Sequence, residues 1–137
     1  HPSGSLGKKL NLSIKNLVDN KRIPIVNPSS SFAEVINEIS SKMYGAAAVL
    51  KDEEIAGIIT DGDIRRVIEK RKNIEDIKAS EFMGNNPKVL KSDILASEAL
   101  KIMKKNNISQ VLVTDNNDSF IGVVHILDII KQGINDE

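Results

Sequence analysis

A hydroxyl and a carboxylate lie three residues apart where a predicted strand is followed by a predicted helix. They belong to Thr60 and Asp63, in the segment Gly57-Ile-Ile-Thr-Asp-Gly-Asp63. The first N–H groups of a helix lack backbone partners and carry partial positive charge, so the Thr60 hydroxyl can join them on a phosphate oxygen. The Asp63 carboxylate can accept hydrogen bonds from both hydroxyls of a ribose. This spacing favours a nucleotide site. The alternative is that both residues only cap the helix.

The segment that holds this motif occurs twice in the chain. A shift of 63 positions aligns identical residues in the first part of each copy: Pro24 with Pro87, Val26 with Val89, Ser29 with Ser92, Ala33 with Ala96, Ile39 with Ile102, Lys42 with Lys105 and Asp52 with Asp115. Two extra residues in the turn 115–119 then raise the shift to 65, which aligns Gly57 with Gly122 and Asp63 with Asp128. Internal repetition of this kind predicts two tandem copies of one structural unit. We place them at residues 23–72 and 87–133, with a linker at 73–86 and a tail at 134–137.

Each copy is predicted to fold as strand, helix, strand, strand, helix, an α/β (α+β) unit. In the first copy, Ser31 and Glu34 have the spacing of a capping box. An apolar stripe at helical spacing follows: Phe32, Val35, Ile36, Ile39 and Met43. The short apolar runs 46–50 and 55–59 predict buried strands, and 62–72 a closing helix. The second copy repeats this order, with strands at 111–114 and 120–124 and a helix at 126–131.

The second copy departs from the motif at one position. Asp128 matches Asp63, but His125 stands where the first copy has Thr60. An imidazole can donate to a phosphate or carboxylate, although its size and pH dependence differ from those of a hydroxyl. Three interpretations remain open. The second copy binds a different group, His125 fills the site so that one site works per pair, or His125 merely packs at a strand end.

Composition excludes several functions. Nineteen basic residues balance nineteen acidic ones, so no net positive charge would hold a nucleic acid or an anionic membrane. The chain has no cysteine, which excludes thiolate chemistry, and its two histidines are too few for a histidine-built zinc site unless carboxylates supply the other ligands. No apolar run is long enough to span a bilayer. We therefore expect a small cytoplasmic domain without a metal site or cofactor.

The order of elements, with Gly57 opening an apolar strand and Asp63 entering the last helix, resembles the CBS domain. Two copies in tandem resemble a CBS pair, or Bateman module, with pseudo-two-fold packing. The segment Ile77-Lys-Ala-Ser-Glu-Phe-Met83 before Pro87 is similar to the family's entry to a repeat. The resemblance implies that Thr60 and Asp63 hold phosphate and ribose. It also indicates further nucleotide-binding candidates: Ile23, Pro24 and Ala47 at the base, with Arg65, His125 and Asp128.

Within that family, the chain resembles the regulatory end of sugar-phosphate isomerases of the arabinose 5-phosphate isomerase type. The string Gly57-Ile-Ile-Thr-Asp-Gly-Asp-Ile-Arg-Arg66 carries this resemblance, together with His1-Pro-Ser-Gly-Ser-Leu-Gly-Lys-Lys9, in which Ser3 departs from the family's usual glycine. Residues 1–22 would then be a linker from an isomerase (SIS) domain that the chain lacks, plus a lead-in helix. His1 would match a catalytic histidine of the parent protein only.

The resemblance implies a parent enzyme that interconverts ribulose 5-phosphate and arabinose 5-phosphate for Kdo, a lipopolysaccharide or capsule precursor. The fragment itself should be inactive and should sense a nucleotide such as CMP-Kdo. Alternatives are an adenine-nucleotide (AMP or ATP) sensor and a ligand-free oligomerisation module. As partners we expect a second CBS pair, giving a homodimer here and a tetramer in the parent enzyme. The shared surfaces would be two apolar helix faces, formed by Ile64, Val67, Ile68, Ile126, Ile129 and Ile130. The alternative is that these faces are buried within one pair.

Overall fold

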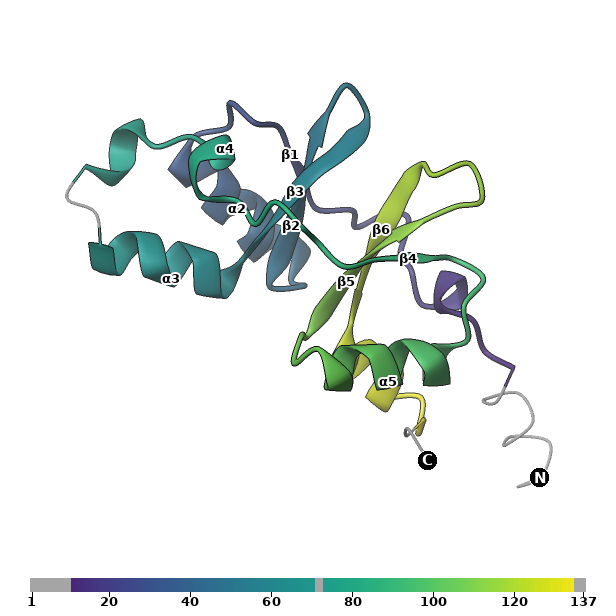
Figure 1. The fold of residues 1–137 in the computed structure, drawn as a ribbon. Coiled ribbons are helices and arrows are strands. Elements are labelled where there is room, and N and C mark those ends of the chain that lie inside the picture. The colour runs from purple at the N-terminus through teal and green to yellow at the C-terminus, as the bar shows by residue number, and fades with distance from the viewer. Residues whose placement is uncertain (1–10, 71–72, 135–137) are drawn as a thin grey trace. The chain divides into compact units, whose positions relative to one another are not determined.

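The computed structural model describes residues 11–70 and 73–134, and these form two compact units (Figure 1). The contiguous unit is a single stretch of chain, Lys21–Pro87. The divided unit combines residues from both ends of the chain, with described parts at 11–20 and 88–134. Each unit contains one copy of the repeat, so the two can be compared residue by residue.

The contiguous unit is a three-stranded sheet with helices. Strand β1 (Ile25–Val26) runs parallel to β2 (Ala46–Lys51), and β2 pairs antiparallel with β3 (Glu54–Thr60). Helix α2 (Phe32–Lys42) joins β1 to β2, as a parallel connection requires. Helix α3 (Asp61–Lys70) follows β3 directly, and a 3-10 turn (Ile74–Asp76) and the short helix α4 (Ala79–Phe82) complete the unit.

The divided unit repeats this topology. Strand β4 (Val89–Lys91) is parallel to β5 (Gln110–Thr114), which is antiparallel to β6 (Phe120–His125). Helix α5 (Ala96–Lys105) connects β4 to β5, and α6 (Ile126–Ile130) follows β6. A 3-10 turn, Ile14–Asn16, stands where the contiguous unit has α4. Both units therefore confirm the predicted strand, helix, strand, strand, helix order and the α/β class.

Helix α2 begins with the predicted capping box. The Glu34 N–H donates to the Ser31 hydroxyl (3.1 Å), and the Ser31 N–H donates to Glu34 Oε1 (3.0 Å). Phe32, Val35 and Ile39 are buried along one face, as the helical spacing predicts. The inclusion of Met43 in that stripe is wrong. Met43 ends the helix in the left-handed conformation (φ 66°), which turns its side chain away, and it is 75% exposed.

The predicted alignment of the copies at 63 positions is also wrong by one residue. Ile25 pairs with Ala48, and Val89 pairs with Leu112, so the first strands and helices correspond at a shift of 64. The turn before the last strand adds one further residue, which brings the shift to 65 for Thr60 and His125. The identities at 63 misled because sheet register follows the buried apolar positions, whereas many of the matched residues lie in turns or on the surface. In this register Lys88, not Pro87, corresponds to Pro24: each accepts a 3.0 Å backbone hydrogen bond from the neighbouring strand.

The segments preceding the copies are exchanged between the units. Residues 11–20 precede the first copy yet pack with the second, where the Ile14 N–H donates to the Ile94 carbonyl (3.0 Å). Residues 77–84 precede the second copy yet pack with the first, where the Ala79 N–H donates to the Ser30 carbonyl (2.9 Å). We call these two segments the lead-ins. The stretches predicted as linkers thus contribute fully buried side chains, among them Ile14 and Ala79.

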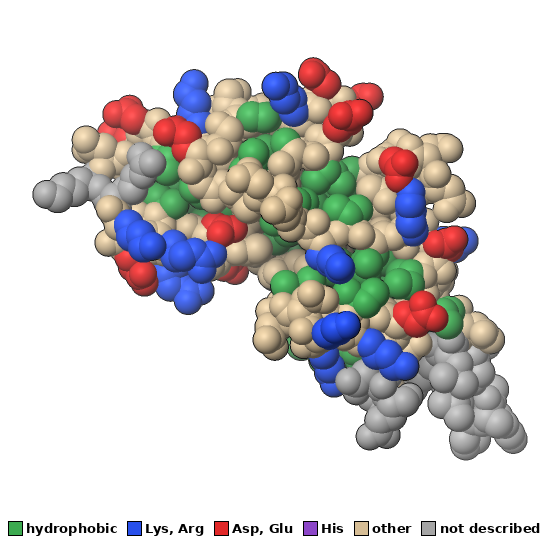
Figure 2. Space-filling model, in the orientation of Figure 1, with side chains coloured by type: hydrophobic (Ala, Val, Ile, Leu, Met, Phe, Trp, Pro, Cys, Tyr) green, Lys and Arg blue, Asp and Glu red, His purple; other side chains and the backbone are tan. Residues whose placement is uncertain are grey.

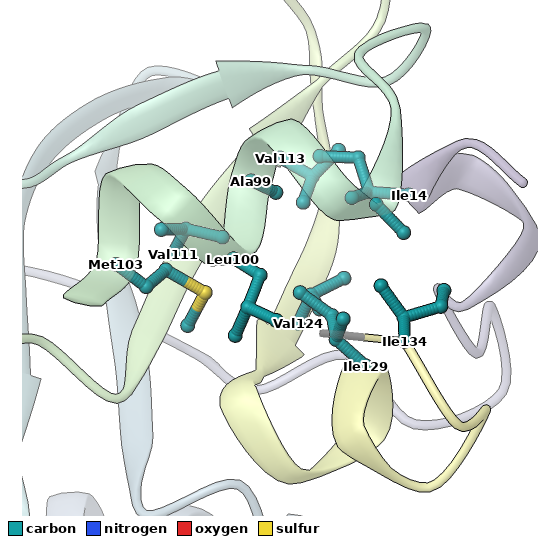
Figure 3. Packing of buried hydrophobic residues seen from close by; sticks show 10 residues of the cluster. Ile14, Ala99, Leu100, Met103, Val111, Val113, Val124, Ile129 and Ile134 are labelled. Atoms are coloured by element: carbon teal, nitrogen blue, oxygen red, sulfur yellow. The ribbon is translucent and has the colours of Figure 1, made fainter. Parts of the chain in front are cut away.

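Each unit has its own apolar core. Figure 3 shows that of the divided unit, where Ile14 from the lead-in meets side chains of α5, β5, β6 and α6. Val67 lies in the core of the contiguous unit and Ile129 in that of the divided unit, so neither can form the shared surface predicted for it. Ile68, Leu127 and Ile130 are the large apolar side chains that α3 and α6 expose. Within 11–70 and 73–134, no helix has the length and apolar character needed to cross a bilayer.

Candidate functional site

Three segments of the contiguous unit meet at one end of its sheet. Because β1 and β2 are parallel, both begin at the same end, and the antiparallel β3 finishes there. Thr60 pairs with Ala46, the first residue of β2, and the Asp61 N–H donates to the Gly45 carbonyl (3.0 Å). The Ala48 N–H donates to the Pro24 carbonyl (3.0 Å). The sheet therefore brings Pro24 close to the turn into α3.

Thr60 and Asp63 contact each other directly at this turn. The Thr60 N–H and its hydroxyl both donate to Asp63 Oδ2, at 2.9 and 3.1 Å. The Asp63 N–H lies 3.3 Å from the Thr60 hydroxyl oxygen. This is the geometry of a helix cap, which the capping alternative predicts. It also places a hydroxyl and a carboxylate side by side, which a nucleotide would need; the nucleotide-binding roles stay predictions.

Arg66 is the arginine that reaches Asp63. Its Nη2 lies 2.6 Å from Asp63 Oδ1, and the exposed fractions are 59% for the Arg66 side chain and 18% for that of Asp63. Arg65, the arginine predicted to contact the ligand, is exposed, and its role stays a prediction. The spacing of Asp63 and Arg66, three positions apart on one helix, is the signal that favours such a pair. Figure 2 shows Lys and Arg side chains gathered over α3.

The three residues predicted to contact a base lie near the same end of the sheet but differ in access. Ile23 is half-buried, and its carbonyl oxygen lies 3.4 Å from Lys42 Nζ. Pro24 is buried. The Ala47 side chain belongs to the apolar core of the unit, so only its backbone could meet a ligand. Ala46 is directly opposite Thr60 and on the same face of the sheet, but its side chain is fully buried as well.

Side chains of α2 and of Tyr44, just beyond its end, contact the chain that enters β1. Glu38 Oε2 accepts hydrogen bonds from the Ile25 N–H (2.8 Å) and from Lys42 Nζ (2.8 Å). The Arg22 guanidinium carbon lies 4.5 Å from the centroid of the Tyr44 ring, within the range of a cation–π contact. These contacts fix the backbone just before Ile25, which is the backbone predicted to meet a base.

The second copy builds the same turn with different side chains. The His125 N–H donates to Asp128 Oδ2 (2.8 Å), as the Thr60 N–H does to Asp63. His125 Nδ1 accepts the Leu127 N–H (3.0 Å), so the ring caps α6. Leu127, 52% exposed, stands where the first copy has Gly62. His125 is half-buried rather than packed away, which leaves its role as a ligand contact a prediction.

The other predicted features give simpler results. Among the described residues no cluster of three or more His, Asp or Glu side chains could hold a metal ion. The segment after Asp115 is a turn, since Asp115 Oδ1 accepts the N–H groups of Asn117 and Ser119. His1, named as a catalytic residue of a parent protein only, lies outside the described residues.

The sequence of the chain matches a known protein family and known proteins. The CBS domain model matches the chain twice, over residues 14–70 and 79–134. Arabinose 5-phosphate isomerase KdsD of Francisella tularensis is 38% identical over 132 residues, which are 96% of this chain and 40% of the relative. Arabinose 5-phosphate isomerase KpsF of Escherichia coli is 37% identical over 130 residues, 93% of this chain and 39% of the relative. The chain thus spans about two fifths of the length of these relatives.

Solved structures share the fold at lower identity. A CBS domain protein of Pyrobaculum aerophilum complexed with AMP matches with a TM-score of 0.76 and 21% identity, over 85% of this chain and 89% of that one. The CBS domain pair of protein MJ0100, in complex with 5'-methylthioadenosine and S-adenosyl-L-methionine, matches with a TM-score of 0.76 and 22% identity, over 87% and 93%. At these identities the likeness shows the fold.

Proposed function

Because the chain belongs to the CBS domain family and carries two tandem copies of that domain, we propose that it is a regulatory module that binds a nucleotide at Thr60 and Asp63. One observation carries this proposal: the sheet places Thr60, Asp63 and the backbone of residue 24 at one end of the contiguous unit. A carboxylate can accept from two ribose hydroxyls, and a hydroxyl can donate to a phosphate. Ile23 and Pro24 are proposed to contact the base.

The parent protein is proposed to be an arabinose 5-phosphate isomerase. The support is the identity to KdsD and KpsF, which extends over nearly all of this chain. In this proposal a preceding domain interconverts ribulose 5-phosphate and arabinose 5-phosphate, and the CBS pair adjusts that activity. CMP-Kdo is a later product of the route that uses arabinose 5-phosphate. Its ribose would bind Asp63, its phosphate would bind Thr60, and its carboxylate would suit an arginine.

An adenine nucleotide is the second candidate ligand. The favouring observation is that two fold neighbours were solved with AMP and with S-adenosyl-L-methionine. The two candidates share a ribose and differ in the base. The residues proposed to contact the base, Ile23 and Pro24, offer backbone groups and aliphatic side chains. Thr60 and Asp63 would therefore serve either ligand.

Titration calorimetry with CMP-Kdo, CMP, AMP and ATP tests the proposal. We expect saturable binding of at least one, and a rise in melting temperature with the same ligand. A ligand at a hundredfold excess over its dissociation constant stabilises the folded state by about 2.7 kcal/mol. Absence of binding by all four at millimolar concentration would contradict the nucleotide proposal and favour a module that only holds subunits together.

A further inference from the structure

We propose that Arg66 determines the ligand class of the Thr60–Asp63 site, by selecting nucleotides over nucleosides. The inference rests on the proposed nucleotide-binding function and names which part of the ligand the site requires. In the structure Arg66 pairs with the carboxylate that a ribose would need. A ligand that binds this carboxylate displaces Arg66 from its anionic partner. A phosphate next to the ribose can replace that partner.

The two oxygens of the Asp63 carboxylate already have partners. Oδ2 accepts both the N–H and the hydroxyl of Thr60, at 2.9 and 3.1 Å. Oδ1 accepts from Arg66 Nη2 at 2.6 Å. A ribose diol that donates two hydrogen bonds to this carboxylate competes with at least one of these donors.

Arg66 is the donor that can leave. The Thr60 N–H is held in the backbone where β3 passes into α3, whereas the Arg66 side chain is 59% exposed. Arg66 also borders an open pocket of about 190 Å³ between α3 and the lead-in of the second copy, so it has room to move. We therefore expect the ribose to displace the guanidinium from Oδ1 while the bonds from Thr60 to Oδ2 persist.

The displaced guanidinium remains next to the Thr60 hydroxyl. A β-carbon built on Gly62 would lie 3.4 Å from Arg66 Nη1, 3.6 Å from Nη2 and 3.6 Å from the Thr60 hydroxyl oxygen. Both groups therefore border the space that the missing side chain of Gly62 leaves open. An anionic group in that space would meet a guanidinium and a hydroxyl together, and guanidinium binds phosphate through two parallel hydrogen bonds.

Ligands with and without a phosphate should then differ in affinity. A nucleoside that binds Asp63 breaks the Arg66–Asp63 ion pair and leaves the guanidinium without an anionic partner. A nucleoside monophosphate breaks the same ion pair, but its phosphate forms a new one with Arg66. The loss of the ion pair therefore weakens the binding only of ligands that lack the phosphate.

The second copy lacks this arrangement. Leu127 occupies the position of Gly62, and Lys131 occupies that of Arg66. Lys131 makes no ion pair with Asp128 in the part of the chain that the structure describes. The alternative for the first copy is that Arg66 and Asp63 form an ordinary surface pair, which contributes little. In that case removal of Arg66 would leave ligand selectivity unchanged.

Calorimetry on the 137-residue chain with two matched ligand pairs, cytidine with CMP and adenosine with AMP, tests the inference. The variants are Arg66→Met, which keeps a long helix-compatible side chain, and Gly62→Leu, which keeps the arginine but fills its place as Leu127 does. Lys131→Met is the matched control in the second copy. Melting curves without ligand verify that each variant is folded.

In Arg66→Met we expect the monophosphate to bind about ten- to hundredfold more weakly, while the nucleoside binds as well as before or better. Gly62→Leu should also lower the ratio of monophosphate affinity to nucleoside affinity, and Lys131→Met should leave that ratio unchanged. Wild-type binding of both members of a pair, with an unchanged ratio in Arg66→Met, would overturn the role of Arg66 and leave the nucleotide site standing. Absence of wild-type binding by all four ligands would overturn this inference, and the proposed function would then depend on whether CMP-Kdo or ATP binds.

Discussion

The backbone N–H groups of Thr60 and His125 make the same hydrogen bond in the two copies, each to the aspartate three residues further on, at 2.9 and 2.8 Å. Their side chains then act differently. The Thr60 hydroxyl donates to Asp63, whereas His125 Nδ1 accepts the Leu127 N–H. A neutral imidazole that accepts at Nδ1 carries its hydrogen on Nε2, so it retains a donor for a ligand. The two copies share a backbone turn and offer different chemistry on it.

Replacing Asp63 separates ligand binding from helix capping. If Asp63 holds a ribose, Asp63→Ala removes charge-assisted hydrogen bonds worth about 1.5–3 kcal/mol and weakens nucleotide binding about ten- to hundredfold. The same change removes a helix cap and should lower the stability of the free protein by about 0.5–2 kcal/mol. Calorimetry measures the first effect and thermal denaturation without ligand measures the second.

Asp128→Ala is the internal control, because Asp128 also accepts the N–H three residues before it. We expect a comparable loss of cap stability and a smaller loss of nucleotide affinity. Equal nucleotide affinity in wild type and Asp63→Ala, with only the melting temperature lowered, would leave Asp63 as a cap alone.

The sequence was sufficient to predict the elements and the turn that carries Thr60, because buried runs, a capping box and a repeated motif are local signals. Two errors came from information that is not local. Met43 has the helical spacing of a core residue but follows the end of the helix. The one-residue error in the repeat alignment arose because identical residues in turns do not determine which strand positions pair. Which arginine reaches Asp63 also depends on side-chain direction on α3 and not on residue type, and Arg66 is the one that does so.

The exchange of lead-ins also could not be predicted, because it depends on long-range packing. Its local signature is one glycine in each copy. A β-carbon on Gly57 would lie 2.6 Å from the Gly84 carbonyl oxygen and 2.7 Å from Met83 Sδ, and one on Gly122 would lie 2.6 Å from Val18 Cγ1. Both glycines therefore provide the space in which a lead-in crosses the last strand of the sheet.

Alanine at these glycines should weaken the packing of the lead-ins. In Gly57→Ala the new methyl group clashes with a backbone oxygen, which no second substitution can remove. Overpacking of this kind lowers the free energy of unfolding by about 1–3 kcal/mol. Gly122→Ala should be partly rescued by Val18→Ala, which removes the clashing methyl but not the strain of φ 155°. Urea denaturation of the single and double variants measures both effects. Gly84→Ala is the control, since its β-carbon would have only ordinary 3.6 Å contacts; an equal loss there would contradict the steric explanation.

Self-association is expected through the apolar side chains that α3 and α6 leave exposed. Ile68, Leu127 and Ile130 are 56%, 52% and 45% exposed, and burial of these side chains against a second copy would remove apolar surface from water. Ile130→Lys and Ile68→Lys should each shift the chain from dimer to monomer in light scattering. Met43→Lys, at a 75% exposed residue outside these helices, should not. A monomeric wild type at high concentration, with and without ligand, would count against this prediction.

The chain should not isomerise ribulose 5-phosphate by itself. General acid–base catalysis needs a base within hydrogen-bond reach of the substrate proton, and the groups at the proposed site are already engaged with one another. A coupled assay for arabinose 5-phosphate with purified protein measures this directly. Turnover above a buffer blank that persists through further purification would refute the prediction.

Acid should weaken the capping box of α2. Hydrogen bonds from the N–H and the hydroxyl of Ser31 hold the pKa of Glu34 below its ordinary value. A lowered folded-state pKa contributes stability above the unfolded pKa, and this contribution is lost as the pH falls through the folded pKa. Glu34→Gln keeps an acceptor without the charge, so wild type should be the more stable at neutral pH and the difference should close in acid. Urea midpoints across that range test this; a difference independent of pH would exclude the charge as its cause.

The exchanged lead-ins also determine when each unit can be completed during synthesis. Everything in the contiguous unit lies between residues 21 and 87, so it can close as soon as that stretch has left the ribosome. The divided unit needs Ile14 against Ile129, one from near the start of the chain and one from near its end. Ile14 must therefore wait until the chain has been translated as far as Ala96 before it can meet the first fully buried core residue of α5, and until Ile129 before the core is complete. At about 5–20 residues per second this interval lasts several seconds. During that time the apolar side chains of residues 11–20 can be shielded from water only by contacts outside the divided unit.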